Sequence, residues 1–369
     1  MTKQEPSPLT LPPTPTPSSI PPSIPPPPTS TPPTASSPST KIPTPFPKPT
    51  VIPPRGTHTH TLILLHGRGD CSLDFSTDII TAPLQFPTPS NPSRSSLPQR
   101  FPGVKFVFPG AKTGRSTAGG NMMMPQWFDV ATLHPVYERE WELARDGLRA
   151  SVNYLLELVR EEGRLLGSVG KVIVGGLSQG AVVALGAAVG FDERADGGGE
   201  ALGGCVVMSG WLPFQRELMA LVKGKIAGDG DGDGADAGTA IVVDDDPEGE
   251  GEGEEERRPK PDPMLAVKAT NWFRENILGI PPVIIDSHPQ SSASQLQISP
   301  PKTPIWIAHG ALDEHVMPQF GENAAKTLEK LGWNVTFMLY DDLAHWYMPD
   351  ELEDMAIYLN VVVGVPDAE

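Results

Sequence analysis

Cysteine is scarce in this chain of 369 residues, which contains only Cys71 and Cys205. Two cysteines cannot build a disulfide framework or supply the ligands of a structural zinc site. Long hydrophobic runs are missing too: no segment has the roughly 18 consecutive apolar residues of a transmembrane helix, so we expect no stable membrane insertion. Without an apolar signal core or a lipidation motif, the sequence predicts a location in the cytoplasm or the nucleus.

Basic residues are fewer than acidic ones: the chain has 28 Lys and Arg and 45 Asp and Glu, which gives a formal net charge of −17. Most of the excess lies in residues 227–262, which carry 14 acidic and three basic side chains. Proteins that bind nucleic acid through their charge need a basic surface. The composition therefore argues against a nucleic-acid partner.

Proline and glycine divide the chain into parts. Residues 1–54 hold 21 of the 44 prolines, and residues 227–262 consist mostly of Gly, Asp, Glu, Pro and Ala. Neither stretch can bury enough apolar surface to offset its ordering entropy. We predict a disordered Pro/Ser/Thr-rich arm at 1–55 and one domain at 56–369, interrupted by a disordered acidic insertion at 227–262 and a polar loop at 286–303. A solvated tail is the favoured interpretation of the arm, ahead of a ligand for SH3- or WW-type domains.

Short, continuous apolar runs alternate with helical patterns along the remaining sequence. Runs of this kind are typical of strands buried on both faces of a parallel sheet. They occur at 62–65, 104–108, 171–174, 205–208, 305–308 and 335–339, and helical periodicity occurs at 137–162, after Ser178, from about 262, at 321–331 and at 349–362. This alternation predicts the α/β class, with a mostly parallel central sheet and helices on both of its faces.

The strongest chemical motif follows the third of these runs. Gly176 and Gly180 flank Ser178 in the pattern G-x-S-x-G, with a strand before it and an Ala-rich helix after it. This context is typical of a nucleophile elbow, a sharp turn that exposes the serine hydroxyl above the sheet. The flanking glycines are needed where the neighbouring chain occupies the place of a Cβ. Ser178 is therefore the predicted nucleophile.

A serine hydroxyl needs a base, and in this arrangement the partners follow in the order Ser, Asp, His. Asp313 follows the strand at 305–308, and His345 follows the strand at 335–339, where open α/β sheets keep their active sites. We predict His345 as the general base and Asp313 as the acid that orients it. For the tetrahedral oxyanion, we predict two backbone N–H donors, from Gln179 and from Arg68 in the loop after the first core strand.

Several other side chains compete for these roles. His315 is the main rival of His345, but it lies two residues from Asp313 in the same loop. Asp341 and Asp342 are rivals of Asp313, but they lie in the loop of His345 itself. His309, beside Gly310, fits a structural histidine better than a catalyst.

The chain resembles the acyl-protein thioesterase, lysophospholipase and carboxylesterase family of α/β-hydrolases. The resemblance covers nearly all of 60–365 outside the insertions and rests on motifs that occur in one order: Leu64-Leu65-His66-Gly67-x-Gly69-Asp70, Trp127-Phe128-Asp129, Gly176-Leu177-Ser178-Gln179-Gly180, Ser209-Gly210-Trp211-Leu212-Pro213, His309-Gly310-x-x-Asp313-x-x-Val316 and His345-Trp346. It implies a Ser–Asp–His triad, no metal or cofactor, and hydrolysis of acyl thioesters or esters on an apolar acyl groove.

For that groove we predict six lining residues, namely Met124, Trp127, Phe128, Trp211, Leu212 and Trp346. The predicted substrate is an acylated protein, through S-palmitoyl-type thioesters. A carboxylesterase or lysophospholipase acting on oxoesters and a non-catalytic scaffold are the alternatives. The sequence departs from the family at Arg68, where Leu is common, in the acidic insertion, and at 78–101, which looks longer than usual. These departures affect the expected shape of the groove and not the triad.

Overall fold

The structure is a computed structural model that describes residues 44–84, 96–132, 140–224, 263–283 and 303–368. The predicted acidic insertion at 227–262 lies outside these residues. So do the first 43 residues of the predicted arm and the polar loop up to residue 302.

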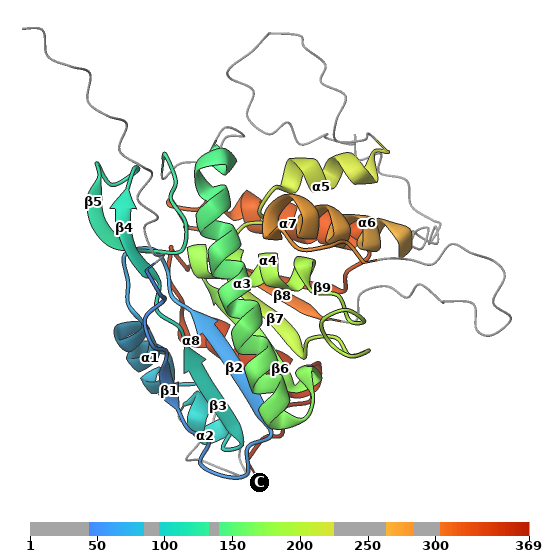
Figure 1. Ribbon diagram of the computed structural model, residues 1–369. Helices are drawn as coiled ribbons and strands as arrows, with labels where there is room; N and C mark the ends of the chain where they lie inside the picture. The colour runs from blue at the N-terminus through green and yellow to red at the C-terminus, as the bar shows by residue number, and fades with distance from the viewer. Residues whose placement is uncertain (1–43, 85–95, 133–139, 225–262, 284–302, 369) are drawn as a thin grey trace, which may run out of the picture. The chain divides into compact units, whose positions relative to one another are not determined.

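Within the described residues, seven strands form one sheet in the order β1-β3-β2-β6-β7-β8-β9 (Figure 1). The core strands are β2 (His60–Leu65), β3 (Val104–Phe108), β6 (Val172–Leu177), β7 (Gly204–Met208), β8 (Ile305–Gly310) and β9 (Val335–Tyr340). They pair in parallel, and β1 (Thr50–Ile52) adds to β3 in the antiparallel direction. The predicted α/β class with a mostly parallel sheet is therefore confirmed, and the residues of β6, β7 and β8 are all buried.

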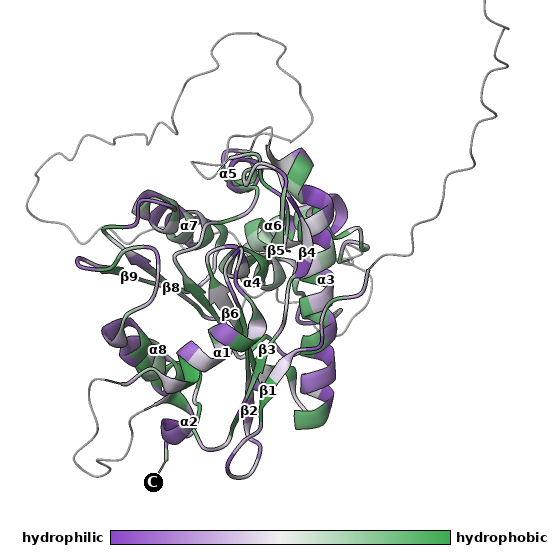
Figure 2. Ribbon diagram, turned by 90° about the vertical axis from the view of Figure 1, so that its left-hand side faces the viewer, coloured by the Kyte–Doolittle hydropathy of each residue, from purple (hydrophilic) through white to green (hydrophobic). Residues whose placement is uncertain are grey.

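Helices cover both faces of the sheet (Figures 1 and 2). Alternate side chains of the strands belong to the core clusters of opposite helical layers. Ile63 and Leu65 of β2 pack on the layer of α3 (Glu140–Leu166), α4 (Gln179–Gly190), α5 (Gln215–Val222), α6 (Pro263–Phe273) and α7 (Pro318–Leu331). Leu62 and Leu64 pack on the layer of α1 (Ser72–Thr81), α2 (Leu97–Arg100) and α8 (Pro349–Val361). This double burial explains why the strands read as continuous apolar runs.

Two elements correct the sequence analysis. The structure places β1 inside the stretch predicted as a disordered arm, and Phe46 stacks on Tyr154 with 4.1 Å between ring centroids. The folded unit therefore begins at Thr44. The second is the hairpin of β4 (Lys112–Ser116) and β5 (Met122–Gln126), which the sequence analysis did not predict. Proline flanks β1 and interrupts β5, so neither segment shows the pattern of a regular strand.

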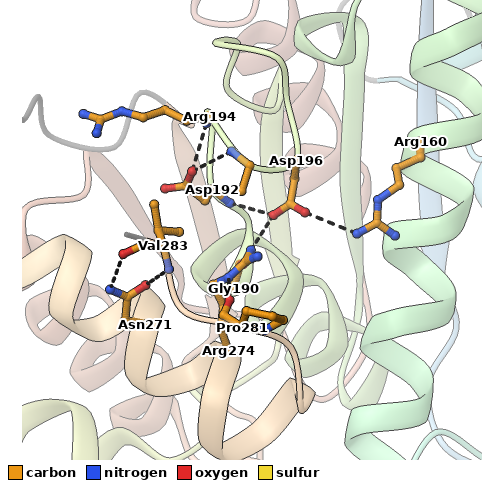
Figure 3. Close-up of polar contacts among 10 residues, drawn as sticks. Arg160, Gly190, Asp192, Arg194, Asp196, Asn271, Arg274, Pro281 and Val283 are labelled. Atoms are coloured by element: carbon orange, nitrogen blue, oxygen red, sulfur yellow. Dashed lines mark hydrogen bonds and ion pairs between the residues drawn. The ribbon is translucent and has the colours of Figure 1, made fainter. Parts of the chain in front are cut away.

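The segment after the acidic insertion is fastened to the main body by polar contacts (Figure 3). Arg274 lies in a π-helical turn (Arg274–Leu278) that continues α6, and it forms a buried ion pair with Asp196 at 2.5 Å. Asp196 also pairs with Arg160 of α3 at 3.3 Å. The side chain of Asn271 bonds both the N–H and the C=O of Val283. α6 is thus an integral part of the helical layer.

Among the helices of the described residues, none combines the length and the apolar character that crossing a membrane requires.

Candidate active site

The turn after β6 has the backbone strain expected of a nucleophile elbow. Ser178 lies between β6 and α4 with φ 56° and ψ −122°, a conformation that non-glycine residues rarely adopt. A Cβ on Gly176 would overlap the backbone of Gly180, and a Cβ on Gly180 would overlap the carbonyl oxygen of Leu65. Both glycines are therefore required for the elbow to pass this close to β2.

His345 links the serine to an acid. Its Nε2 lies 3.0 Å from Oγ of Ser178, and its Nδ1 lies 2.7 Å from Oδ2 of Asp313. The three residues follow β6, β8 and β9, so their proximity results from parallel strands that end at the same edge of the sheet. The structure thus brings the three predicted residues into one hydrogen-bonded chain.

The carboxylate of Asp313 is buried and receives four hydrogen-bond donors. Oδ1 accepts the backbone N–H groups of His315 at 2.9 Å and Val316 at 2.8 Å. Oδ2 faces His345 and, at 3.2 Å, Nε2 of His309. Burial alone raises the pKa of Asp313, but the hydrogen bonds from His309, His345 and Val316 outweigh it and hold the pKa far below its usual range. Asp313 therefore stays ionised beside His345.

The rival side chains do not take the place of Asp313 or His345, although His315 lines the same pocket as Ser178. Asp341 and Asp342 are exposed, and no hydrogen bond among the described residues joins either of them to His345. His315 is exposed and meets His345 edge to face, with 5.4 Å between the ring centroids. His309 is fully buried, and its Nε2 also donates to the carbonyl of Val316 at 2.7 Å. That contact fits the structural role expected for His309.

The loop after β2 runs beside the nucleophile. Arg68 and Gln179 both line the same pocket as Ser178. Gln179 is the first residue of α4, so its N–H has no intrahelical acceptor. The N–H of Arg68 has no hydrogen-bond acceptor within the described part of the chain. Two residues of the pocket lining therefore each carry a backbone N–H without a hydrogen-bond acceptor among the described residues.

A network of buried bonds holds this loop, and Trp127 is its centre. Nε1 of Trp127 donates to the carbonyl of His66 at 2.7 Å, and its backbone N–H donates to Oε1 of Gln179 at 3.2 Å. The Gln179 amide also donates to the carbonyl of Phe128 at 3.0 Å. The loop after β2 and the elbow are thereby tied to the same segment.

The pocket above Ser178 has a volume of about 370 Å³, a size typical of small-molecule sites. It contains two of the predicted groove residues, Trp211 and Trp346, but not Met124, Leu212, Trp127 or Phe128. Trp127, Phe128 and Leu212 are buried in the core. Met124 lies on the hairpin strand β5, against the Arg68 guanidinium.

The remaining apolar lining comes from residues that were not predicted for the groove, among them Val130, Leu177, Val316 and Phe320. Leu177 directly precedes the nucleophile, and Val316 and Phe320 closely follow Asp313. Their nearness in sequence to the predicted triad is the signal that could have identified them.

One group of side chains has the composition of a metal site. Ligand atoms of Asp70, Cys71 and Asp74 lie within 4.8 Å of one another. Cys71 caps α1 by accepting the N–H of Asp74 at 3.4 Å, and Asp70 accepts the N–H of Cys71 at 2.7 Å. These contacts account for the cluster as a helix cap.

The chain was compared with known proteins. A family model described as Phospholipase/Carboxylesterase matches residues 47–226 and 283–363. The acyl-protein thioesterase 1 of Aspergillus fumigatus is 24% identical over 329 residues, which cover 86% of this chain and 94% of that protein. That of Yarrowia lipolytica is 30% identical over 175 residues, covering 47% and 67%. The crystal structure of Zea mays acyl-protein thioesterase 2 has a TM-score of 0.52 at 23% identity and covers 86% of this chain and 99% of its own, which supports the fold.

Proposed function

This chain belongs to the phospholipase/carboxylesterase family of α/β-hydrolases and is a serine ester and thioester hydrolase, and from that premise we propose that it acts as an acyl-protein thioesterase. The hydrogen-bonded chain from Asp313 through His345 to Ser178 is the observation that carries the proposal. The full-length similarity to the acyl-protein thioesterase 1 of Aspergillus fumigatus supports thioesters as substrates.

In the proposed mechanism, Ser178 attacks the acyl carbonyl while His345 accepts the hydroxyl proton. Asp313 keeps the His345 proton on Nδ1, so that Nε2 faces Ser178 as an acceptor, and stabilises the imidazolium that forms. The backbone N–H groups of Arg68 and Gln179 bind the oxyanion of the tetrahedral intermediate. The protonated His345 then gives its proton to the departing thiolate, which leaves Ser178 acylated.

Deacylation repeats these roles with water as the nucleophile. His345 takes a proton from the water, the hydroxide attacks the acyl carbon, and the fatty acid leaves as the Ser178 hydroxyl is restored. The apolar lining of Trp211, Val316 and Phe320 receives the first carbons of the acyl chain. These side chains exclude water there and favour an acyl group over a polar one.

A second candidate is the hydrolysis of lipid or small oxoesters, which the description of the matching family favours. The same nucleophile, base and oxyanion donors serve both reactions, because a thioester and an oxoester pass through the same kind of tetrahedral intermediate. The two candidates therefore differ in substrate and not in machinery.

The experiment that tests the proposal is active-site labelling with a fluorophosphonate, followed by hydrolysis of an S-palmitoyl cysteine peptide. We expect stoichiometric labelling that maps to Ser178, palmitate release by the wild type, and neither event with Ser178→Ala. Ser209→Ala is the matched control, because Ser209 is buried after β7 and lies outside the pocket. Folded wild-type protein that resists the probe would contradict the mechanism and support a non-catalytic scaffold.

A further inference from the structure

A positively charged residue of the pocket lining forms no ion pair with a described residue. Arg68 lines the Ser178 pocket together with Asp70. Its Nη1 donates to Oγ of Ser116 at 2.9 Å and lies 3.8 Å from Sδ of Met124, and both of these partners are neutral. Among the described residues, no ion pair includes Arg68.

Two carboxylates lie near Arg68, and neither forms an ion pair with it among the described residues. Asp129 attracts Arg68 electrostatically, but its oxygens accept hydrogen bonds from Thr117 and from the N–H of Val130. Asp70 also lines the pocket; its Oδ1 accepts the N–H of Cys71, and its Oδ2 is buried without a hydrogen-bond partner in the described part of the chain. Within the described residues, the charge of Arg68 is therefore not neutralised by an ion pair.

Burial makes this arrangement costly. Desolvation lowers the pKa of Arg68, against the opposing attraction of Asp129. A guanidinium offers five N–H donors in a planar fork that matches carboxylate and phosphate groups. Nη1 is the nitrogen that bonds Ser116 and Met124, so Nε and Nη2 remain as donors for a ligand.

We propose that Arg68 forms an anion-binding subsite of this pocket, which selects acyl substrates carrying a carboxylate or phosphate group near the scissile bond. The inference rests on the proposed function and narrows its substrate class. An anion bound there pairs with a cation that has no ion pair among the described residues. The anion can belong to the acyl chain or to the leaving group, because both pass the pocket next to Ser178.

The test uses three thioesters that differ in the place of one charge. Butyryl and succinyl thioesters of N-acetylcysteamine compare a neutral with an anionic acyl group, and the butyryl thioester of 3-mercaptopropanoate places the charge on the leaving group. The readout is the kcat/KM of each anionic substrate divided by that of the neutral one. We expect wild type to favour at least one anionic substrate, and Arg68→Met to lower that ratio by about 10- to 100-fold, the size of a charge-assisted hydrogen bond.

Two further variants make the result specific. Arg68→Lys keeps the charge and should retain part of the preference. Arg115→Met removes a charge from the hairpin of β4 and β5, to which Ser116 and Met124 also belong. Arg115 is exposed and outside the pocket, so the kcat/KM ratio of this variant should equal that of wild type. The backbone N–H of Gly69 also donates to the carbonyl of Pro125 on this hairpin. A second interpretation is therefore that Arg68 only holds its loop against the hairpin, as a tether. A tether predicts an equal loss for neutral and anionic substrates, and that result would overturn the subsite.

Dissociation constants separate this inference from the proposed function, because binding is measured without turnover. Ser178→Ala and the double variant Ser178→Ala/Arg68→Met are titrated with all three thioesters by calorimetry. Tighter binding of an anionic thioester that depends on Arg68 supports the subsite even if turnover is absent. Equal affinities in both proteins refute the subsite even if turnover is fast.

Discussion

Replacing Asp313 by Asn tests the triad because it changes which nitrogen of His345 carries the proton. In the wild type, Oδ1 of Asp313 accepts two backbone N–H groups, from His315 and Val316, and Oδ2 faces Nδ1 of His345 at 2.7 Å. An asparagine oxygen must stay on the two backbone donors, because turning the amide around would lose both hydrogen bonds. The NH₂ group then takes the place of Oδ2 and donates toward His345.

This substitution changes the tautomer of the His345 imidazole. Nδ1 of His345 has to accept from the new NH₂ group, so the proton moves to Nε2, which lies 3.0 Å from Oγ of Ser178. A protonated Nε2 donates to the hydroxyl and cannot remove its proton. The expected loss in kcat is on the order of 10⁴-fold, as found when this tautomer is imposed on a serine protease triad.

The assay is steady-state hydrolysis of an acyl thioester by Asp313→Asn, with circular dichroism as the check on folding. Asp341→Asn and Asp342→Asn are the matched controls, since both side chains are exposed in the loop of His345 and should keep kcat near the wild-type value. If either control lost activity by orders of magnitude while Asp313→Asn retained it, the assignment of the acid would be refuted.

Three further predictions concern stability. Glu351 is fully buried, and burial raises its pKa from 4.5 to about 8 against a backbone hydrogen bond at Met348 that lowers it. The free energy of unfolding should therefore fall by about 4 to 5 kcal/mol as pH rises from 4.5 to 8. Glu351→Gln should remove that share of the pH dependence in denaturant titrations, whereas an unchanged slope would exclude Glu351 as its source. Asp196→Asn leaves the buried Arg274 without its partner carboxylate and should lower the free energy of unfolding in urea by about 3 to 5 kcal/mol. A loss near zero would show that the pair does not fasten α6. Deleting 1–43 should leave the melting temperature unchanged, whereas deleting 1–54 removes β1 and should lower it, so equal melting temperatures would contradict the role of β1.

The sheet and the elbow were predictable because their signals are local. Residues buried on both faces of a parallel strand are apolar without interruption. The elbow motif occupies five consecutive residues, although its glycines are required partly by the distant carbonyl of Leu65. Asp313 and His345 each follow a strand that ends at the same edge of the sheet, so chain order and topology suffice to bring them together.

The elements that the sequence analysis missed depend on distant partners. The three residues of β1 lie in a proline-rich stretch, and Phe46 finds its place only against Tyr154, more than 100 positions away. Apolar character alone likewise could not separate groove from core. Trp127 and Phe128 are as hydrophobic as Trp211, but they are buried in the core and do not line the pocket, and their backbone groups bond the Gln179 side chain.

The most direct test of the proposed thioesterase activity is kcat/KM for matched thioester and oxoester substrates from acetyl to palmitoyl, with Ser178→Ala as the blank. The account predicts that efficiency rises with chain length and is higher on thioesters, because added methylenes bury apolar surface along the pocket of Trp211 and Phe320. Highest efficiency on short oxoesters, with no gain from longer chains, would contradict it and support a carboxylesterase instead.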